Sequence, residues 1–101
     1  MKTMERDVFA AISEARRREI LEHMIGLTER GTASSVTDIA RELGMDRSTV
    51  SRCLAFLREC SVVTCRRLGT QRLHSLVVEP LRYLDDWANA LGARLDELAH
   101  E

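Results

Sequence analysis

The chain has 101 residues, of which 45% are hydrophobic and 31% charged, and this composition indicates one folded domain over residues 1–101. No apolar run approaches the roughly 18 residues of a membrane helix, and the N-terminus lacks the apolar stretch of a signal peptide. We therefore expect a cytoplasmic protein with no membrane partner. The three cysteines form no CxxC pair, which argues against a disulfide framework or a zinc knuckle.

The charge is unevenly distributed along the chain, although the net charge is only −1. Residues 46–72 contain six arginines and two acidic residues, whereas residues 73–101 contain two arginines and six acidic residues. The excess of positive charge in the middle of the chain indicates a nucleic-acid contact there.

The N-terminal part predicts two helices. A short amphipathic helix is expected over residues 4–12, and Ser13 can cap a second helix over about residues 14–27. The apolar side of the first helix consists of Met4, Val8, Phe9 and Ile12. The three arginines at 16–18 point in different directions on the second helix, so we expect them to be solvated or paired with glutamates rather than bound to DNA.

Residues 35–57 predict two short helices joined by a tight turn. Ser35 can cap the first helix, and Gly44 can end it in the left-handed conformation. Asp46 can then cap the second helix by accepting from the amides of Ser48 or Thr49. Two short helices joined by a glycine-containing turn are the sequence form of a helix-turn-helix, whose second helix enters the DNA major groove.

The second of these helices has an outer face suited to DNA. Its apolar stripe toward the core consists of Val50, Cys53, Leu54 and Leu57. The opposite face presents Arg47, Ser48, Ser51, Arg52, Ala55 and Arg58. Hydroxyl and guanidinium groups bind phosphate oxygens and base edges, whereas an ordinary solvated face would mix in glutamate and lysine. We therefore predict DNA contacts from Thr37, Arg47, Ser48, Thr49, Ser51 and Arg52.

Residues 60–78 predict a β-hairpin, since two β-rich runs flank a turn that contains Gly69. Its polar tip consists of Arg66, Arg67, Gln71 and Arg72. A basic hairpin directly after a helix-turn-helix is a wing, which reaches phosphates or the minor groove beside the reading helix. Charges on an edge hairpin also deter strand-to-strand aggregation, so the two roles are compatible.

The last part of the chain predicts a helix of about twenty residues that opens at Glu79 and Pro80. Its apolar stripe is longer than a small domain can cover, which indicates a second chain. The expected dimer interface combines the two terminal helices and consists of Val8, Ile12, Leu84, Trp87, Leu91, Leu95 and Leu98.

Several local strings resemble the ArsR-type winged-helix repressors of bacteria, over nearly the whole chain. They are Ala15–Leu21, Val36–Ala40, Ser48–Glu59, Arg66–Gly69 and the region of Trp87. The resemblance implies a mainly α fold with a small β-hairpin, a winged helix-turn-helix of five helices plus the wing. It also implies a homodimer paired through the terminal helices, which represses transcription by binding an imperfect palindrome in double-stranded promoter DNA. Many such repressors respond to an effector, whose identity the sequence does not give.

The sequence departs from the metal-sensing members of that family. They carry a Cys-x-Cys-type motif where this chain has Val36-Thr37-Asp38, and Trp87 follows Asp85 where other members place a histidine ligand. We therefore expect no metal and no cofactor. A thiol- or metal-responsive repressor remains the alternative because of Cys53, Cys60 and Cys65.

Two other classes of function were weighed against DNA reading. A winged helix that only binds proteins would show an acidic or apolar outer face on the second helix of the motif, which this chain lacks. An enzyme would need a glycine-rich phosphate loop, a nucleophile with its base, or paired carboxylates in a pocket, and the sequence contains none of these patterns. The sequence therefore predicts a DNA-binding regulator and no enzyme.

Overall fold

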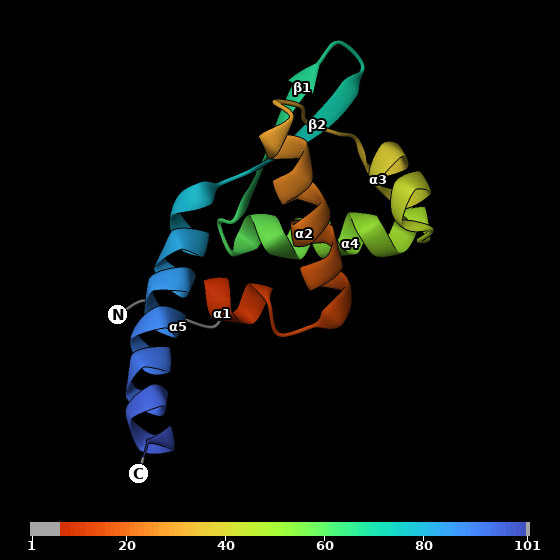
Figure 1. Cartoon of the computed structure of the whole chain (residues 1–101). Coiled ribbons are helices and arrows are strands. Elements are labelled where there is room, and N and C mark those ends of the chain that lie inside the picture. The colour runs from red at the N-terminus through yellow and green to blue at the C-terminus, as the bar shows by residue number, and fades with distance from the viewer. Residues whose placement is uncertain (1–6, 101) are drawn as a thin grey trace, which may run out of the picture.

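The computed structural model describes residues 7–100. Four helices come first: α1 (Val8–Ala11), α2 (Ala15–Glu29), α3 (Val36–Leu43) and α4 (Arg47–Glu59). The antiparallel strands β1 (Val63–Leu68) and β2 (Gln71–Leu76) and the long helix α5 (Val78–Ala99) complete the chain (Figure 1). The five helices and one hairpin of the described residues confirm the predicted winged helix-turn-helix architecture.

The first helix is shorter than the predicted range of 4–12. Asp7 begins it by accepting from the amides of Phe9 and Ala10 at 3.0 and 3.1 Å. The predicted core position Met4 lies outside the described residues. Ser13 does not cap α2, contrary to expectation, because its hydroxyl donates to the carbonyl of Ala10 at 2.8 Å. Glu14 caps α2 instead, through the amide of Arg17 at 3.2 Å.

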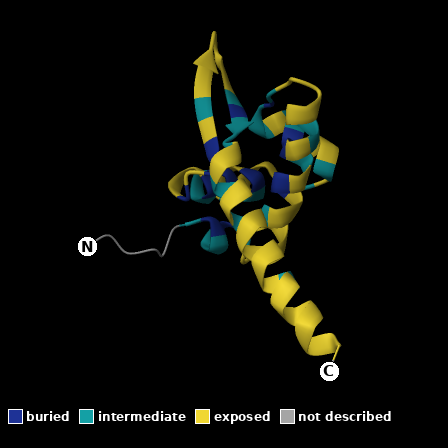
Figure 2. Ribbon diagram, turned by 60° about the vertical axis from the view of Figure 1, so that its left-hand side comes forward, coloured by how far each residue is buried: buried dark blue, intermediate teal, exposed yellow. Residues whose placement is uncertain are grey.

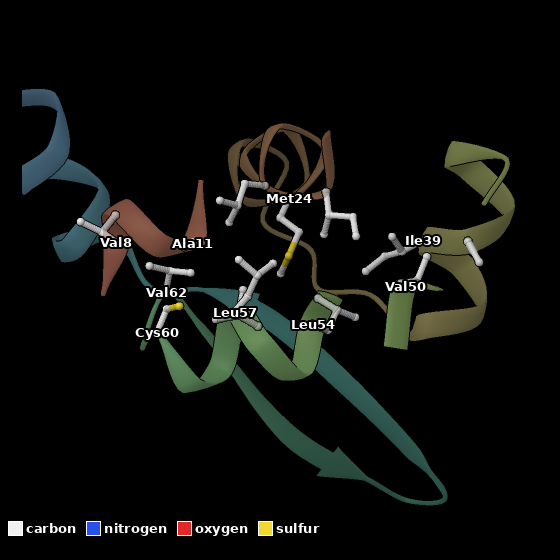
Figure 3. Packing of buried hydrophobic residues seen from close by; sticks show 13 residues of the cluster. Val8, Ala11, Met24, Ile39, Val50, Leu54, Leu57, Cys60 and Val62 are labelled. Atoms are coloured by element: carbon white, nitrogen blue, oxygen red, sulfur yellow. The ribbon is translucent and has the colours of Figure 1, made fainter. Parts of the chain in front are cut away.

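The core lies between α2, α3 and α4 and is closed by α1 and the start of β1 (Figure 3). Its largest fully buried side chains are Ile20, Met24, Ile39, Leu54, Leu57, Val50 and Val62. The predicted stripe of α4 is therefore correct at three of its four positions, and Cys53 is half-buried. Burying one leucine or isoleucine contributes about 1.5–3 kcal/mol, so this cluster fixes the relative placement of the three helices.

The caps of α3 and α4 confirm two predictions and contradict a third. The hydroxyl of Ser35 accepts from the amide of Asp38 at 3.2 Å, and Gly44 ends α3 with φ 66° in the left-handed region, as expected. Asp46 occupies the N-cap position of α4, but its carboxylate makes no capping hydrogen bond in the described structure. The predicted role of that carboxylate is therefore wrong, and only its backbone position is correct.

The hairpin begins later than the predicted Cys60 because residues 60–62 cap the end of α4. Cys60 is the C-cap of α4, and the amides of Ser61 and Val62 donate back to the carbonyls of Arg58 and Leu57 at 3.0 and 3.1 Å. Ser61 has φ 64° in this Schellman motif, where glycine is usual. The strand therefore begins at Val63 and not at Cys60, since the residues between are needed to end the helix.

The wing consists of β1, β2 and their two-residue turn, in which Gly69 has φ 64°. At its base, Ser34 forms a bridge with His74, and the two residues exchange backbone hydrogen bonds of 3.3 and 2.8 Å. The segment before α3 thus acts as a short third strand that clamps the base of the hairpin.

The long helix α5 leaves the domain after its first turns. Leu81 and Leu84 pack against the core, and Phe9 of α1 meets Tyr83 and Trp87 edge to face, with ring centroids 6.2 and 5.2 Å apart. None of the described residues of α5 is fully buried, and its C-terminal half projects from the molecule at the end opposite the wing (Figures 1 and 2). Over the described part of the chain, no helix is long and apolar enough to cross a membrane.

Candidate nucleic-acid interface

Helix α4, the reading helix, presents the predicted polar face to solvent. Arg47, Ser48, Ser51 and Arg52 are exposed, and Thr49 is half-buried. The buried residues Val50, Leu54 and Leu57 lie on the other side and hold the helix against the core. The structure therefore leaves the hydroxyl and guanidinium groups of this face available for base edges and phosphates.

A groove of about 410 Å³ joins three of the elements that the sequence assigns to DNA contact. Thr37 from the first turn of α3, Arg47 from the first turn of α4, and Gln71 and Arg72 from the wing all line it. Asp38 also lines the groove, but its carboxylate accepts from Arg41 at 2.8 Å. This bond, together with one from Ser35, lowers the pKa of Asp38, so the acid is paired with a cation at the edge of the site.

A second groove of about 540 Å³ lies between the end of the reading helix and the wing and is strongly basic. Its arginines are Arg58, Arg66, Arg67 and Arg72. Arg67 and Arg72 are directly opposite each other in the strand register, and no ion pair within residues 7–100 neutralises either of them. Like charges placed opposite on two strands are destabilising, so this pair costs stability unless an anion lies between or beside them.

The reading helix and the wing are joined by one side-chain contact that the sequence did not reveal. Nη1 of Arg58 lies 3.2 Å from Nε2 of His74, a residue that is only 3% exposed. Burial, and secondly the charge of Arg58, lower the pKa of His74, which favours the neutral imidazole. Arg58 was predicted on the outer face but not counted among the contacts, and its place in the basic groove adds it to the site.

With this geometry in view, comparison with known families shows which one the motif represents. The model of the IclR helix-turn-helix domain matches residues 7–66, from the cap of α1 into the first strand of the wing. The chain belongs to this family. The IclR-type helix-turn-helix is thus a DNA-binding motif of a transcriptional regulator. Curated protein sequences include no match to the chain.

Solved structures extend the likeness beyond the IclR-type helix-turn-helix to the whole chain. An ArsR-like transcriptional regulator from Rhodococcus sp. RHA1 is 25% identical, with a TM-score of 0.71 over 95% of this chain and 84% of that chain. A homodimeric winged helix-turn-helix domain of a possible ArsR-family regulator from Mycobacterium bovis is 26% identical, with a TM-score of 0.64 over 93% and 81%. These structures confirm the predicted resemblance to ArsR-type regulators.

The residues predicted for the dimer interface of this IclR-type protein fall into two groups. Leu91, Leu95 and Leu98 are 39%, 53% and 67% exposed, and Trp87 is half exposed, so an apolar stripe on α5 faces solvent. The remaining three are partly or fully covered within the described chain, namely Val8, Ile12 and Leu84. Val8 is only 5% exposed and belongs to the core, so its side chain offers almost no surface to a partner.

The fold keeps the three cysteines in different surroundings, and no disulfide joins any of them within residues 7–100. Cys60 is buried at the end of α4. Burial raises the pKa of the half-buried Cys53, so the surroundings of Cys53 do not favour a thiolate. Cys65 is half-buried and lines the basic groove beside the wing arginines. No group of three or more potential metal-ligating side chains occurs among residues 7–100.

Two of the three arginines near the N-terminus have a role that sequence reasoning missed. Arg17 donates to the carbonyls of Ala10 and Ala11, and Arg18 donates to the carbonyl of Ile12 at 2.8 Å. Within residues 7–100, only the 4.0 Å pair between Arg17 and Glu14 resembles the expected glutamate pairing. The missed signal is the shortness of α1, whose C-terminal carbonyls need donors from elsewhere.

Proposed function

We propose that the chain is a homodimeric repressor that binds an imperfect palindrome in promoter DNA. Its family is that of helix-turn-helix DNA-binding transcriptional regulators. The observation that supports DNA binding in this proposal is the unneutralised pair Arg67 and Arg72, which lines the basic groove together with Arg58 at the end of the reading helix. A hairpin that keeps two like charges opposite each other is best explained by a polyanion that binds between them.

Each part of the site takes a separate role in this proposal. Ser48, Ser51 and Arg52, exposed on the reading helix, contact base edges in the major groove. Thr37 and Arg47, at the starts of two successive helices, bind phosphate oxygens, which the helix N-termini also attract. The wing arginines and Arg58 hold the phosphates on the other side of the reading helix.

The dimer is proposed to form through α5. The exposed leucines of its C-terminal half form an apolar stripe that the rest of the described chain does not cover. The Mycobacterium bovis neighbour, whose domain is homodimeric, supports the same assembly here. A two-fold dimer would place two reading helices about 34–36 Å apart, one turn of DNA, and would therefore recognise a palindrome. A dimer seated on a promoter would repress by blocking polymerase.

The proposal is tested with promoter DNA from upstream of the chain's own gene. Fluorescence anisotropy should show binding that weakens steeply with salt and exceeds binding to a random duplex by about 10³-fold or more. Analytical ultracentrifugation of the complex should give two chains per duplex, and run-off transcription from that promoter should fall as the protein is added. Equal affinity for the promoter and the random duplex would contradict the proposal, as would one chain per duplex.

A further inference from the structure

The side chain of Arg17 lies where α1, α2 and α4 meet, and it is 15% exposed. Its Nε donates to the carbonyl of Ala11 at 3.0 Å, and its Nη2 donates to the carbonyl of Ala10 at 3.1 Å and to the hydroxyl of Ser13 at 3.0 Å. One planar guanidinium therefore satisfies the two last carbonyls of α1 and also fixes the corner that follows.

The same guanidinium packs on the reading helix. Its Cζ lies 4.1 Å from the centre of the ring of Phe56, which is a residue of α4. A cation over an aromatic face is attracted by the ring, and this contact is favoured in a partly buried site. Arg17 thus holds α1 and the reading helix together with two kinds of directional contact.

On the side of α5, α1 is held by aromatic contacts. Phe9 meets Tyr83 and Trp87 edge to face. Helix α1 has only four residues, too few to be stable alone, so its orientation depends on what holds it from each side. The contacts therefore run from α5 through Phe9 to α1, and from α1 through Arg17 to Phe56 on the reading helix.

We propose that Arg17 is a positioning residue that fixes the angle between the reading helix and α5, and so sets the half-site spacing that the dimer accepts. This inference depends on the proposed function, since spacing matters only for a dimer bound to a palindrome. In such a dimer the partner is held by α5, and the base edges are read by α4. Any rotation between these two helices displaces both reading helices along the DNA.

The apolar contacts between α5 and the body do not fix this angle as firmly. Leu81 and Leu84 pack against the core from the first half of α5. Apolar burial has little directional preference, so it permits small rotations at a low cost. The hydrogen bonds of Arg17 depend on the positions of two carbonyls of α1, and a rotation of α1 would break them.

The test uses the full chain and a palindrome that the wild-type protein selects from a random duplex library. The half-sites are then moved apart or together by one and two base pairs, and a duplex with a single half-site is included. Arg17→Met removes the donors and the charge but keeps an unbranched side chain. Arg17→Lys keeps the charge but has no planar fork that reaches both carbonyls. Arg18→Met is the matched control, because Arg18 also donates to the end of α1 but, within residues 7–100, forms no hydrogen bond or ring contact with α4.

Wild-type protein and the Arg18→Met variant should lose about tenfold in affinity for each base pair of misplacement, because one base pair both translates and rotates a half-site. Both Arg17 variants should lose less than about threefold per base pair, with unchanged affinity for the single half-site. If Arg17→Met does not fold, Phe56→Leu removes the aromatic face from the other side of the contact and should give the same flat profile.

Two results would overturn the inference. In the first, the Arg17 and Phe56 variants lose the same factor in affinity at every half-site spacing, as expected if these residues only stabilise the fold. In the second, the variants keep the wild-type dependence of affinity on spacing. A wild-type protein with no spacing preference is a different result. It would contradict the palindrome-binding dimer of the proposed function, and the inference with it.

Discussion

Arg58 of the reading helix donates a hydrogen bond to His74 of the wing, and this bond requires a neutral imidazole. A guanidinium has donors only, so Nε2 of His74 must accept and the ring proton must be on Nδ1. Nδ1 is itself buried and has no partner among the described residues. Protonation would add a second donor facing Arg58 and a positive charge beside Arg58 and Arg72, both of which already lower the pKa of His74.

This relationship predicts a loss of stability in mild acid. The unfolded chain has a histidine of ordinary pKa near 6.5, whereas the pKa of His74 in the folded state is lower. In the interval between the two values only the unfolded state binds the proton, so stability is complete above about pH 6.5 and decreases as the pH falls. The slope contributed by one group is at most about 1.4 kcal/mol per pH unit.

Urea unfolding of the wild type and of His74→Gln from about pH 8 to pH 5 measures this contribution. Glutamine keeps an acceptor for Arg58 but does not titrate. The free energy of unfolding of the variant should fall less steeply below pH 6.5 than that of the wild type. Parallel curves would show that His74 does not control the acid sensitivity.

Arg52→Ala should remove a base contact. Arg52 is exposed in the middle of the reading face, and the loss should cost about 1–3 kcal/mol on the selected palindrome and relax the preference at one base pair. Arg47→Ala is the matched comparison, because a phosphate contact supports selected and random DNA alike. Anisotropy titrations on the selected and the random duplex distinguish a lost base contact from a lost phosphate contact. If Arg52→Ala leaves the ratio of the two affinities unchanged, Arg52 does not read a base.

Replacing Arg66, Arg67 and Arg72 by alanine should weaken DNA binding without weakening the fold. Each lost phosphate contact should reduce the slope of log K against log salt by about 0.9. Removal of the opposed pair Arg67 and Arg72 should raise the free energy of unfolding by about 0.2–1 kcal/mol, because a like-charge pair disappears. An unchanged salt slope in the triple variant would assign these arginines to protection of the hairpin edge.

Leu91→Glu should prevent dimer formation and abolish binding to the palindrome. A carboxylate there would face its symmetry mate in an apolar seam, where ionisation is costly. Ile25→Glu is the control, since Ile25 on α2 is 42% exposed against 39% for Leu91. Sedimentation at micromolar concentration should show a monomer for the first variant and a dimer for the second. A wild-type monomer that binds its palindrome tightly would rule out this interface.

Ser61→Gly should stabilise the protein by about 0.5–1 kcal/mol, because glycine adopts a positive φ without the steric cost that serine pays. Ser61→Ala is the control and should have little effect, since alanine has the same Cβ. Thermal or urea unfolding measures both changes. A destabilised glycine variant would mean that the hydroxyl of Ser61 contributes more than the backbone strain costs.

Local signals predicted the helix-turn-helix and the wing well. The apolar spacing of Val50, Leu54 and Leu57, the glycine at 44 and the serine at 35 act within one or two turns of helix, so they can be read from the sequence. The exposed polar face of α4 follows from the same periodicity, because the residues that are not buried must point outward.

Tertiary contacts decided the features that could not be predicted. Glu14 caps α2 because the hydroxyl of Ser13 is bound to the end of α1, and Arg17 turns inward because the ring of Phe56 and the carbonyls of Ala10 and Ala11 lie there. The pairing of Arg58 with His74 joins residues 16 positions apart, which no helical or strand period connects. Val8 is buried because α1 folds back onto the core, whereas the amphipathic pattern alone allowed a dimer contact equally well.

The clamp between Ser34 and His74 divides the wing into two parts with different mobility. The paired amides at the base should exchange with deuterium slowly, because Ser34 adds a third segment there. The amides around Gly69 should exchange quickly, because each strand at the tip pairs only with the other strand of the hairpin. Arg67 and Arg72 lie on the tip side of this clamp. In the proposed complex with DNA, these two arginines would therefore adapt to minor grooves of different width while the reading helix keeps its position in the major groove.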